Sequence, residues 1–175
     1  TPALSSAASD VYKRQSPNVT LEEDLERRDL TINSMALDEN GNLIDPFNGA
    51  KDIENKCFRP VSQAFFEDPL RALRVARFKA QFPKFFLHES MEQALVKISA
   101  SNELLNLSSE RVWGEVVKGL GHDFHQFLQI IKNYNLHEPW FNKLSKIPDI
   151  NSDIAEIKWC EVSQANEFKF AMCLD

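Results

Sequence analysis

The sequence predicts an α+β protein in which a small β-hairpin region precedes a longer all-helical region, with the change near residue 63. The pair Asn40-Gly41, which is preferred in tight hairpin turns, lies between two short apolar runs. After residue 63, apolar residues recur at helical spacing, most clearly over residues 67–82. With 175 residues, 43% of them hydrophobic, the chain can form one ordinary globular core.

The first region is predicted to contain several short elements. Thr20, followed by Glu22 and Glu23, is typical of a helix N-terminus with an acidic first turn. Charged residues with apolar residues among them predict a short helix over residues 25–35. The remaining predicted elements are a hairpin over 35–45, a turn over 45–49, a short helix over 50–55 and a strand over 57–61.

The second region is predicted to be helical throughout. Its first helix carries Pro69 in the first turn, where a missing N–H is harmless, and a later one starts at Ser108, Ser109 and Glu110 with a capping pattern. The predicted helices cover residues 67–82, 89–98, 108–120, 123–134 and 138–146.

Charge and composition exclude several classes of protein. A net charge of −6 argues against nucleic-acid binding by bulk charge, so any contact with RNA must use a local patch. No run of 18 apolar residues exists, which predicts no membrane partner. Cys57, Cys160 and Cys173 are widely spaced and form no C-x-x-C pair, which favours a reduced, cytoplasmic setting.

A first cluster of candidate binding residues follows the first predicted helix. It comprises Arg27, Arg28, Asp29 and Asn33. Adjacent guanidinium groups beside a carboxylate suit contacts to phosphate or ribose, because the planar arginine fork holds phosphate oxygens in a bidentate way. The alternative is a solvated charged face with Glu23–Arg27 and Asp24–Arg28 ion pairs.

A second cluster lies on the helix predicted over residues 67–82. It comprises Asp68, Arg71, Arg74 and Arg77. Arginines three residues apart drift by about 60° per step around a helix, so some lie among apolar groups, where a charge needs a bound anion or a fixed carboxylate. A carboxylate acceptor beside a guanidinium donor could also bind a base edge that offers an amino donor next to a ring nitrogen, as cytosine and adenine do. The alternative is a Glu67–Arg71 pair with arginine stems lying along apolar surface.

A third cluster, His122-Asp123-Phe124-His125, is an incomplete set of metal ligands. A helix start after Gly121 explains it better, because an acidic residue favours a helix N-terminus. The sequence predicts no metal ligand in this chain, and it contains no glycine-rich phosphate loop or nucleophile elbow.

Three blocks together resemble the class II tRNA nucleotidyltransferases, the bacterial CCA-adding enzymes and their poly(A) polymerase relatives. They are Val-Thr-Leu-Glu-Glu-Asp-Leu-Glu-Arg-Arg-Asp-Leu-Thr-Ile-Asn-Ser-Met-Ala from Val19, Ile-Asp-Pro-Phe-Asn-Gly from Ile44 and Glu-Asp-Pro-Leu-Arg-Ala-Leu-Arg-Val-Ala-Arg-Phe from Glu67. The similarity extends over residues 19–120, and Ser109-Glu110-Arg111-Val112-Trp113 is similar to the start of the family's neck helix.

The resemblance implies CCA addition, the transfer of nucleotides from CTP and ATP to the 3′ acceptor end of tRNA, with Mg²⁺. It implies that Arg27, Arg28, Asp29 and Asn33 hold the ribose and triphosphate, with Arg28 the strongest candidate. Asp68 and Arg71 would hydrogen-bond the base, Arg74 and Arg77 would complete the pocket, and residues 45–49 would form the joint between the head and neck domains.

The chain also departs from the family pattern. The Gly-Gly…Arg phosphate loop and the Asp-x-Asp pair that holds two magnesium ions are absent before Glu22. We therefore expect no catalytic carboxylate in this chain and no activity from it alone. The expected domains are a foreign or disordered segment (1–15), the C-terminal part of a nucleotidyltransferase head (16–62), a nucleotide-selecting neck (63–122) and the truncated start of a helical body (123–175). The alternatives are a poly(A) polymerase and a non-catalytic helical module that binds nucleotide or RNA.

Overall fold

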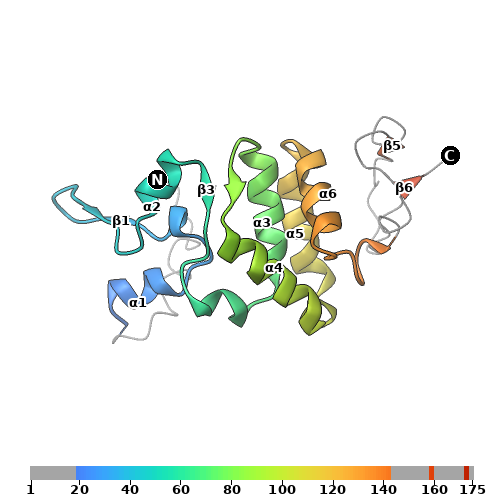
Figure 1. Cartoon of the computed structure of the whole chain (residues 1–175), viewed down its shortest axis with the longest axis horizontal. Helices are drawn as coiled ribbons and strands as arrows, with labels where there is room; N and C mark the ends of the chain where they lie inside the picture. Colours follow the sequence, from blue (N-terminus) through green and yellow to red (C-terminus); the bar gives the residue numbers. More distant parts are fainter. Residues whose placement is uncertain (1–18, 143–157, 160–171, 174–175) are drawn as a thin grey trace, which may run out of the picture.

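The computed structural model describes residues 19–142 together with the short segments 158–159 and 172–173. Short helices and a hairpin occupy one end of the described part, and longer helices occupy the other (Figure 1). This arrangement confirms the predicted α+β class. The elements are α1 (Leu21–Glu26), η3 (Thr31–Asn33), β1 (Ala36–Leu37), β2 (Leu43–Ile44), α2 (Gly49–Glu54), β3 (Cys57–Phe58), η4 (Gln63–Glu67), α3 (Leu70–Gln81), β4 (Phe86–Leu87), α4 (Glu89–Ser101), η5 (Glu103–Asn106), α5 (Ser109–Leu120), α6 (Phe124–Asn133), β5 (Lys158–Trp159) and β6 (Met172–Cys173).

Helix α1 begins where the sequence predicts and ends earlier. Thr20 caps it through a capping box: its hydroxyl accepts from the Glu23 backbone N–H, and the Glu23 carboxylate accepts from the Thr20 N–H at 2.7 Å. The prediction of a helix over residues 25–35 is wrong, because the chain becomes extended at Leu30. That side chain is fully buried, and its backbone forms a bridge with Pro60, a tertiary contact that outweighs local helix propensity.

The predicted hairpin is confirmed, with β1 and β2 antiparallel and Leu37 opposite Leu43. Its connection is longer than the two-residue turn expected at Asn40-Gly41. The Asp38 backbone N–H donates to the Asn42 carbonyl at 2.9 Å, and the Asp38 carboxylate accepts from the Asn40 and Asn42 backbone N–H groups. Gly41 adopts a φ of 82°, which glycine tolerates without steric cost.

Helix α2 follows the predicted turn, and a side chain four residues before its start caps its first N–H groups. Both oxygens of the Asp45 carboxylate accept, one from the Gly49 N–H at 2.7 Å and the other from the Ala50 N–H at 2.9 Å. The predicted strand at 57–61 is shorter, as β3, and it pairs in parallel with β4, a partner that the sequence does not reveal. A parallel partner needs a crossover, and here α3 provides it.

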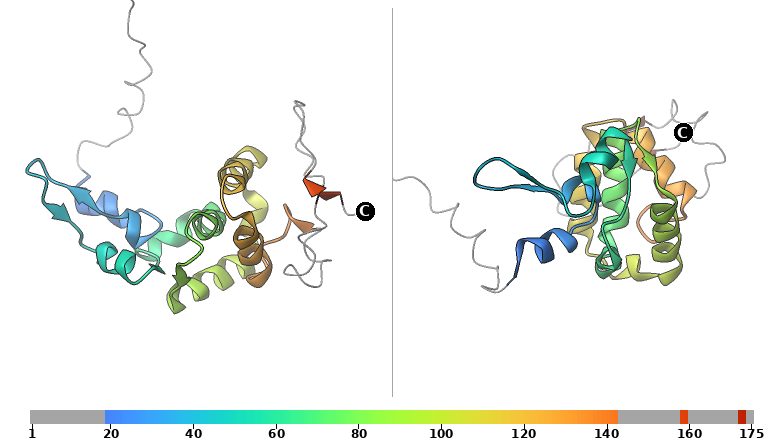
Figure 2. Two further views of the ribbon diagram at one scale, coloured as in Figure 1. Left: turned by 90° about the horizontal axis from the view of Figure 1, so that it is seen from above. Right: turned by 60° about the vertical axis from the view of Figure 1, so that its left-hand side comes forward.

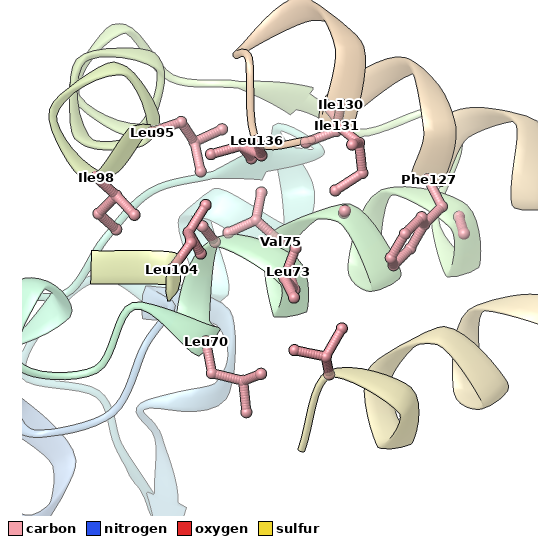
Figure 3. Close-up of a cluster of buried hydrophobic side chains, with 14 of the residues drawn as sticks. Leu70, Leu73, Val75, Leu95, Ile98, Leu104, Phe127, Ile130, Ile131 and Leu136 are labelled. Carbon is pink, nitrogen blue, oxygen red and sulfur yellow. The ribbon is translucent and has the colours of Figure 1, made fainter. Parts of the chain in front are cut away.

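The core lies around α3, which packs against both α5 and α6 (Figure 3). The side chains that form it are apolar and come from several elements, and Leu30 and Phe58 of the first region belong to the same cluster. Those labelled in the figure are Leu70, Leu73, Val75, Leu95, Ile98, Leu104, Phe127, Ile130, Ile131 and Leu136.

The predicted helices at 67–82, 89–98, 108–120 and 123–134 correspond to α3, α4, α5 and α6, with Asp123 as the N-cap residue of α6. The first begins later than expected, because residues 63–67 form the 3₁₀ helix η4 and Pro69 is the N-cap residue of α3. The helix predicted over 138–146 is wrong for residues 138–142, where turns follow Leu136. The rest of that prediction, and the segment 1–15, lie outside the described residues.

Candidate functional site

Six of the eight predicted site residues line one hollow of about 470 Å³. Its walls come from three places in the chain: the segment after α1, the start of α3 and the start of α5. In the view from above, α3 lies between the segment around α1 and the helices α5 and α6 (Figure 2). The lining residues are Arg28, Asp29, Asn33, Asp68, Leu70, Arg71, Arg74 and Arg111.

The charge of this hollow differs in sign from that of the chain. Four arginines and two aspartates line it, so the lining carries a net positive charge of two, whereas the whole chain carries −6. A local cationic surface of this kind suits an anionic ligand such as a phosphate ester, because arginine binds phosphate oxygens through parallel N–H donors. The hollow is therefore a local cationic patch of the kind that an acidic chain would need in order to contact RNA.

Asp29 and Arg74 form the floor of the hollow. Arg74 Nε donates to Asp29 Oδ2 at 2.6 Å, and Asn33 Nδ2 donates to Asp29 Oδ1 at 2.8 Å. The Asp29 side chain is only 4% exposed. Burial raises the pKa of Asp29, but the hydrogen bond and the positive charge of Arg74, with the hydrogen bond of Asn33, lower it by more, so the pKa lies below the ordinary value for aspartate. Asp29 is therefore a fixed, ionised acceptor that aims the Arg74 guanidinium.

Arg77 lies outside the hollow, against α5. Its Nε donates to Glu115 Oε2 at 2.6 Å, and its guanidinium lies over the Phe78 ring at 4.0 Å. Glu115 is buried, and its other oxygen, Oε1, lies 3.1 Å from Lys118 Nζ and 4.0 Å from Arg74 Nη1. Of the two partners that the sequence analysis allowed for these arginines, a bound anion or a fixed carboxylate, the structure shows the carboxylate for two of them: Asp29 for Arg74 and Glu115 for Arg77.

Glu115 was missed by sequence reasoning, although a signal was available. It stands three residues after Val112 and four before Gly119, both buried, and therefore lies on the apolar face of α5. A carboxylate at such a position needs a cation from a neighbouring element. The arginines of α3 were the obvious source.

Asp68 and Arg71, the pair predicted to contact a base, lie in the same hollow but do not bind each other. Asp68 Oδ2 accepts from Arg111 Nη2 at 2.6 Å, and Oδ1 accepts from the Leu70 backbone N–H at 3.2 Å. The Arg71 guanidinium donates to the backbone carbonyls of Ala64 and Arg27. No Glu67–Arg71 ion pair forms, so that alternative for the second cluster is not what the structure shows in its described part.

Arg27 and Arg28 point to different places. Arg28 lines the hollow of about 470 Å³, where Nη1 donates to the Asn33 carbonyl at 2.8 Å and Nη2 pairs with Asp24 at 3.2 Å. Arg27 instead lines a separate hollow of about 920 Å³ between α1, residues 59–67 and α4. That larger hollow carries charges of both signs and apolar residues, so its volume alone does not indicate a site. The Asp24–Arg28 ion pair, which belongs to the alternative interpretation of the first cluster as a solvated charged face, is present in the structure.

The described residues contain no group of three or more His, Cys, Asp or Glu placed to hold a metal ion. The carboxylates of Asp29 and Glu115 form ion pairs with Arg74 and Arg77, and residues 122–125 lie at the start of α6. We therefore assign no magnesium ligand to this part of the chain. A search of the same residues for a helix long and apolar enough to cross a bilayer also found none.

Comparison with known proteins identifies the class to which this fold and hollow belong. Residues 4–59 match the family model described as the Poly A polymerase head domain. The match begins inside residues 1–15, whose foreign origin stays a prediction. Together with the relatives below, this match places the chain in the family of tRNA nucleotidyltransferases and poly(A) polymerases.

Several curated relatives with high sequence identity are named as CCA-adding proteins. The chain is 49% identical over 132 residues to the multifunctional CCA protein of Pseudoalteromonas atlantica, covering 74% of this chain and 33% of the relative. It is 53% identical over 121 residues to the CCA-adding enzyme of Hamiltonella defensa, covering 67% and 30%. The chain thus spans about a third of the length of the curated relatives it matches.

Solved structures agree with the sequence relatives. The Bacillus stearothermophilus CCA-adding enzyme in complex with CTP has a TM-score of 0.61 and 39% identity, covering 67% of this chain and 30% of that one. A tRNA nucleotidyltransferase complexed with a primer tRNA and an incoming ATP analog has a TM-score of 0.64 and 34% identity, covering 71% and 38%.

Proposed function

We propose that this chain forms the nucleotide-selecting part of a CCA-adding tRNA nucleotidyltransferase, which transfers nucleotides from CTP and ATP to the 3′ acceptor end of tRNA. The observation that supports it is the convergence of six residues, from two separate motifs, on one cationic hollow. Relatives named for CCA addition, and similar solved structures with CTP, an ATP analog and tRNA, support it further.

The proposed selection of the base rests on Asp68 and Arg71. Cytosine and adenine both present an amino donor beside a ring-nitrogen acceptor, whereas uracil and guanine present the reverse order. A carboxylate that accepts and a guanidinium that donates, both lining one hollow, would complement the first pattern and oppose the second. Each such paired contact discriminates by about 1–3 kcal/mol between right and wrong bases.

The other predicted residues take two kinds of role in this proposal. Arg28, Asn33 and Arg74 lie in the hollow and would contact the ribose and phosphates, with Asp29 holding Arg74 in place. Arg27 and Arg77 lie outside it, and each would act through a neighbour. The Arg27 carbonyl accepts a hydrogen bond from Arg71, and Arg77 fixes Glu115.

Magnesium belongs to the proposed reaction, where it would activate the primer hydroxyl and stabilise the leaving pyrophosphate. Because no acidic cluster suits it among the described residues, we derive no step through it here. We propose a cytoplasmic location, and we expect the chain to bind nucleotide without transferring it. Incorporation of labelled CMP or AMP into tRNA lacking CCA by the purified chain would contradict that expectation.

The test is equilibrium binding of CTP, ATP, UTP and GTP to the purified chain, measured by calorimetry. We expect tighter binding of CTP and ATP, and loss of that preference in the Asp68→Ala variant. Glu67→Ala is the matched control: it removes the neighbouring carboxylate, which lines the larger hollow instead, and should keep the preference. Preference for ATP alone would favour the poly(A) polymerase alternative, and equal affinity for all four would refute base selection.

A further inference from the structure

Arg111 lines the cationic hollow of about 470 Å³ and belongs to neither of the two clusters of predicted site residues. It is the third residue of α5, whose guanidinium donates from Nη2 to Asp68 Oδ2 at 2.6 Å, across 43 residues of sequence. The side chain is about half exposed, and it is the residue that α5 contributes to the lining. The short distance is typical of a charge-assisted hydrogen bond.

The two groups proposed to contact the base are held by different parts of the molecule. Arg71 is fixed by the carbonyls of Ala64 and Arg27, in the segments that precede α3. Asp68 precedes α3, with an extended backbone, and one of its oxygens faces the Leu70 N–H. The direction of its second oxygen is determined by Arg111, because that is the side-chain donor which reaches it.

Helix α5 is suited to hold α3 in this way because two of its charged residues lie on one face. Arg111 and Glu115 are four residues apart and therefore project from the same side of the helix. Arg111 binds the carboxylate just before α3, and Glu115 binds Arg77 within α3. Because α5 contributes a cation to one contact and an anion to the other, the two contacts can form together in only one register of α5 against α3.

We propose that Arg111 is a positioning residue for base selection: it holds the Asp68 carboxylate so that an oxygen faces the exocyclic amino group of cytosine or adenine. This inference rests on the function proposed above. Arg111 acts through Asp68 and makes no contact with the base. Without it, Asp68 rotates among rotamers, and its acceptor oxygen no longer distinguishes an amino group from a carbonyl.

The test is the ratio of the Kd values for UTP and CTP, in the wild-type chain and in Arg111→Ala, Arg111→Lys and the control Lys97→Ala. We expect Arg111→Ala to lower the ratio about fivefold, through weaker CTP binding, as removal of one exposed charge-assisted partner allows. Arg111→Lys should recover part of the ratio. Lys97 is exposed and lines the larger hollow, so its loss changes net charge equally and should leave the ratio unchanged.

Two outcomes overturn the inference. If Arg111→Ala weakens all four nucleotides by one factor, and the loss shrinks at high salt, Arg111 is a phosphate ligand instead. If the ratio does not change, Asp68 needs no positioning. A wild-type chain without any preference among the four nucleotides refutes the proposed function itself, a result separable from both. Equal melting temperatures of the variants, within a few degrees, exclude unfolding as the cause.

Discussion

Replacing Gly49 by alanine tests the joint between the hairpin and α2. A Cβ added at Gly49 would lie 2.2 Å from the Thr31 carbonyl oxygen and 2.9 Å from the Met35 sulfur. The first of these is a backbone atom and cannot rotate away. The helix cannot retreat easily either, because the Asp45 carboxylate holds the Gly49 and Ala50 N–H groups.

The size of the effect follows from that contact. Carbon and oxygen atoms that are not bonded approach to rather more than 3 Å, so α2 and Thr31 must separate by about 1 Å. Thr31 resists the shift, since its hydroxyl donates to the buried Asp52 at 2.7 Å and its N–H donates to the Arg59 carbonyl at 3.0 Å. Overpacking of this kind costs about 1–3 kcal/mol. We expect a loss in the upper half of that range, about 2–3 kcal/mol, or a melting temperature lower by about 4–12 °C.

The assay is urea unfolding followed by tryptophan fluorescence and far-ultraviolet circular dichroism. Gly114→Ala is the matched control: a Cβ there meets nothing within 4 Å, and the residue is inside α5. Alanine in a helix interior is favoured over glycine by about 0.5–1 kcal/mol, so this variant should be more stable than the wild type. A Gly49→Ala chain as stable as the wild type, or a Gly114→Ala chain that loses as much as Gly49→Ala, would refute the reasoning.

Two further predictions concern the buried carboxylates. Glu115→Ala should lower the free energy of unfolding by about 3 kcal/mol, because it leaves Arg77, which is largely buried, without its carboxylate acceptor. Lys118→Ala removes an exposed partner of Glu115 and should change the free energy of unfolding by less than about 0.5 kcal/mol, so equal losses in urea unfolding would contradict this prediction. A second prediction concerns Asp29, whose pKa is raised by burial, lowered more by Arg74 and Asn33 together, and so lies below the ordinary value. The ionised Asp29 therefore contributes its full stabilisation above the unfolded pKa of about 4, and that contribution is lost as the pH falls through the lower pKa of the folded state. Asp29→Asn should therefore show a shallower fall of unfolding free energy below about pH 4, and a slope equal to that of the wild type would disprove the linkage.

Local patterns predicted much of the fold. The hairpin follows from Asn40-Gly41, and α3 to α6 follow from apolar spacing, because both signals lie within a few residues of one another. The failures are long-range. The helix expected over 25–35 stops because Leu30 is buried and bridges Pro60, and β3 pairs with β4 nearly thirty residues later. No local window contains those partners.

The site shows the same division. The spacing of the α3 arginines predicted that some of them need a bound anion or a fixed carboxylate, but it could not say that Glu115 and Asp29 supply the carboxylate. Arg27 and Arg28 are neighbours of identical chemistry, yet they line different hollows, because α1 ends at Glu26 and the chain turns there. Where a side chain points after a helix end depends on the tertiary fold.

The ion pair between Asp29 and Arg74 complicates any functional test of Arg74. Its Nε is committed to a buried carboxylate, so Arg74→Ala leaves an unpaired charge and should cost about 3–5 kcal/mol of stability before any nucleotide is considered. Asp29→Asn in the same chain removes that charge, and the double variant should be more stable than Arg74→Ala alone. A cycle of the two single variants and the double variant separates the pair energy from the affinity for CTP. Purely additive losses of stability would mean that the pair contributes nothing, and only then could a loss of affinity in Arg74→Ala be assigned directly to a missing phosphate contact.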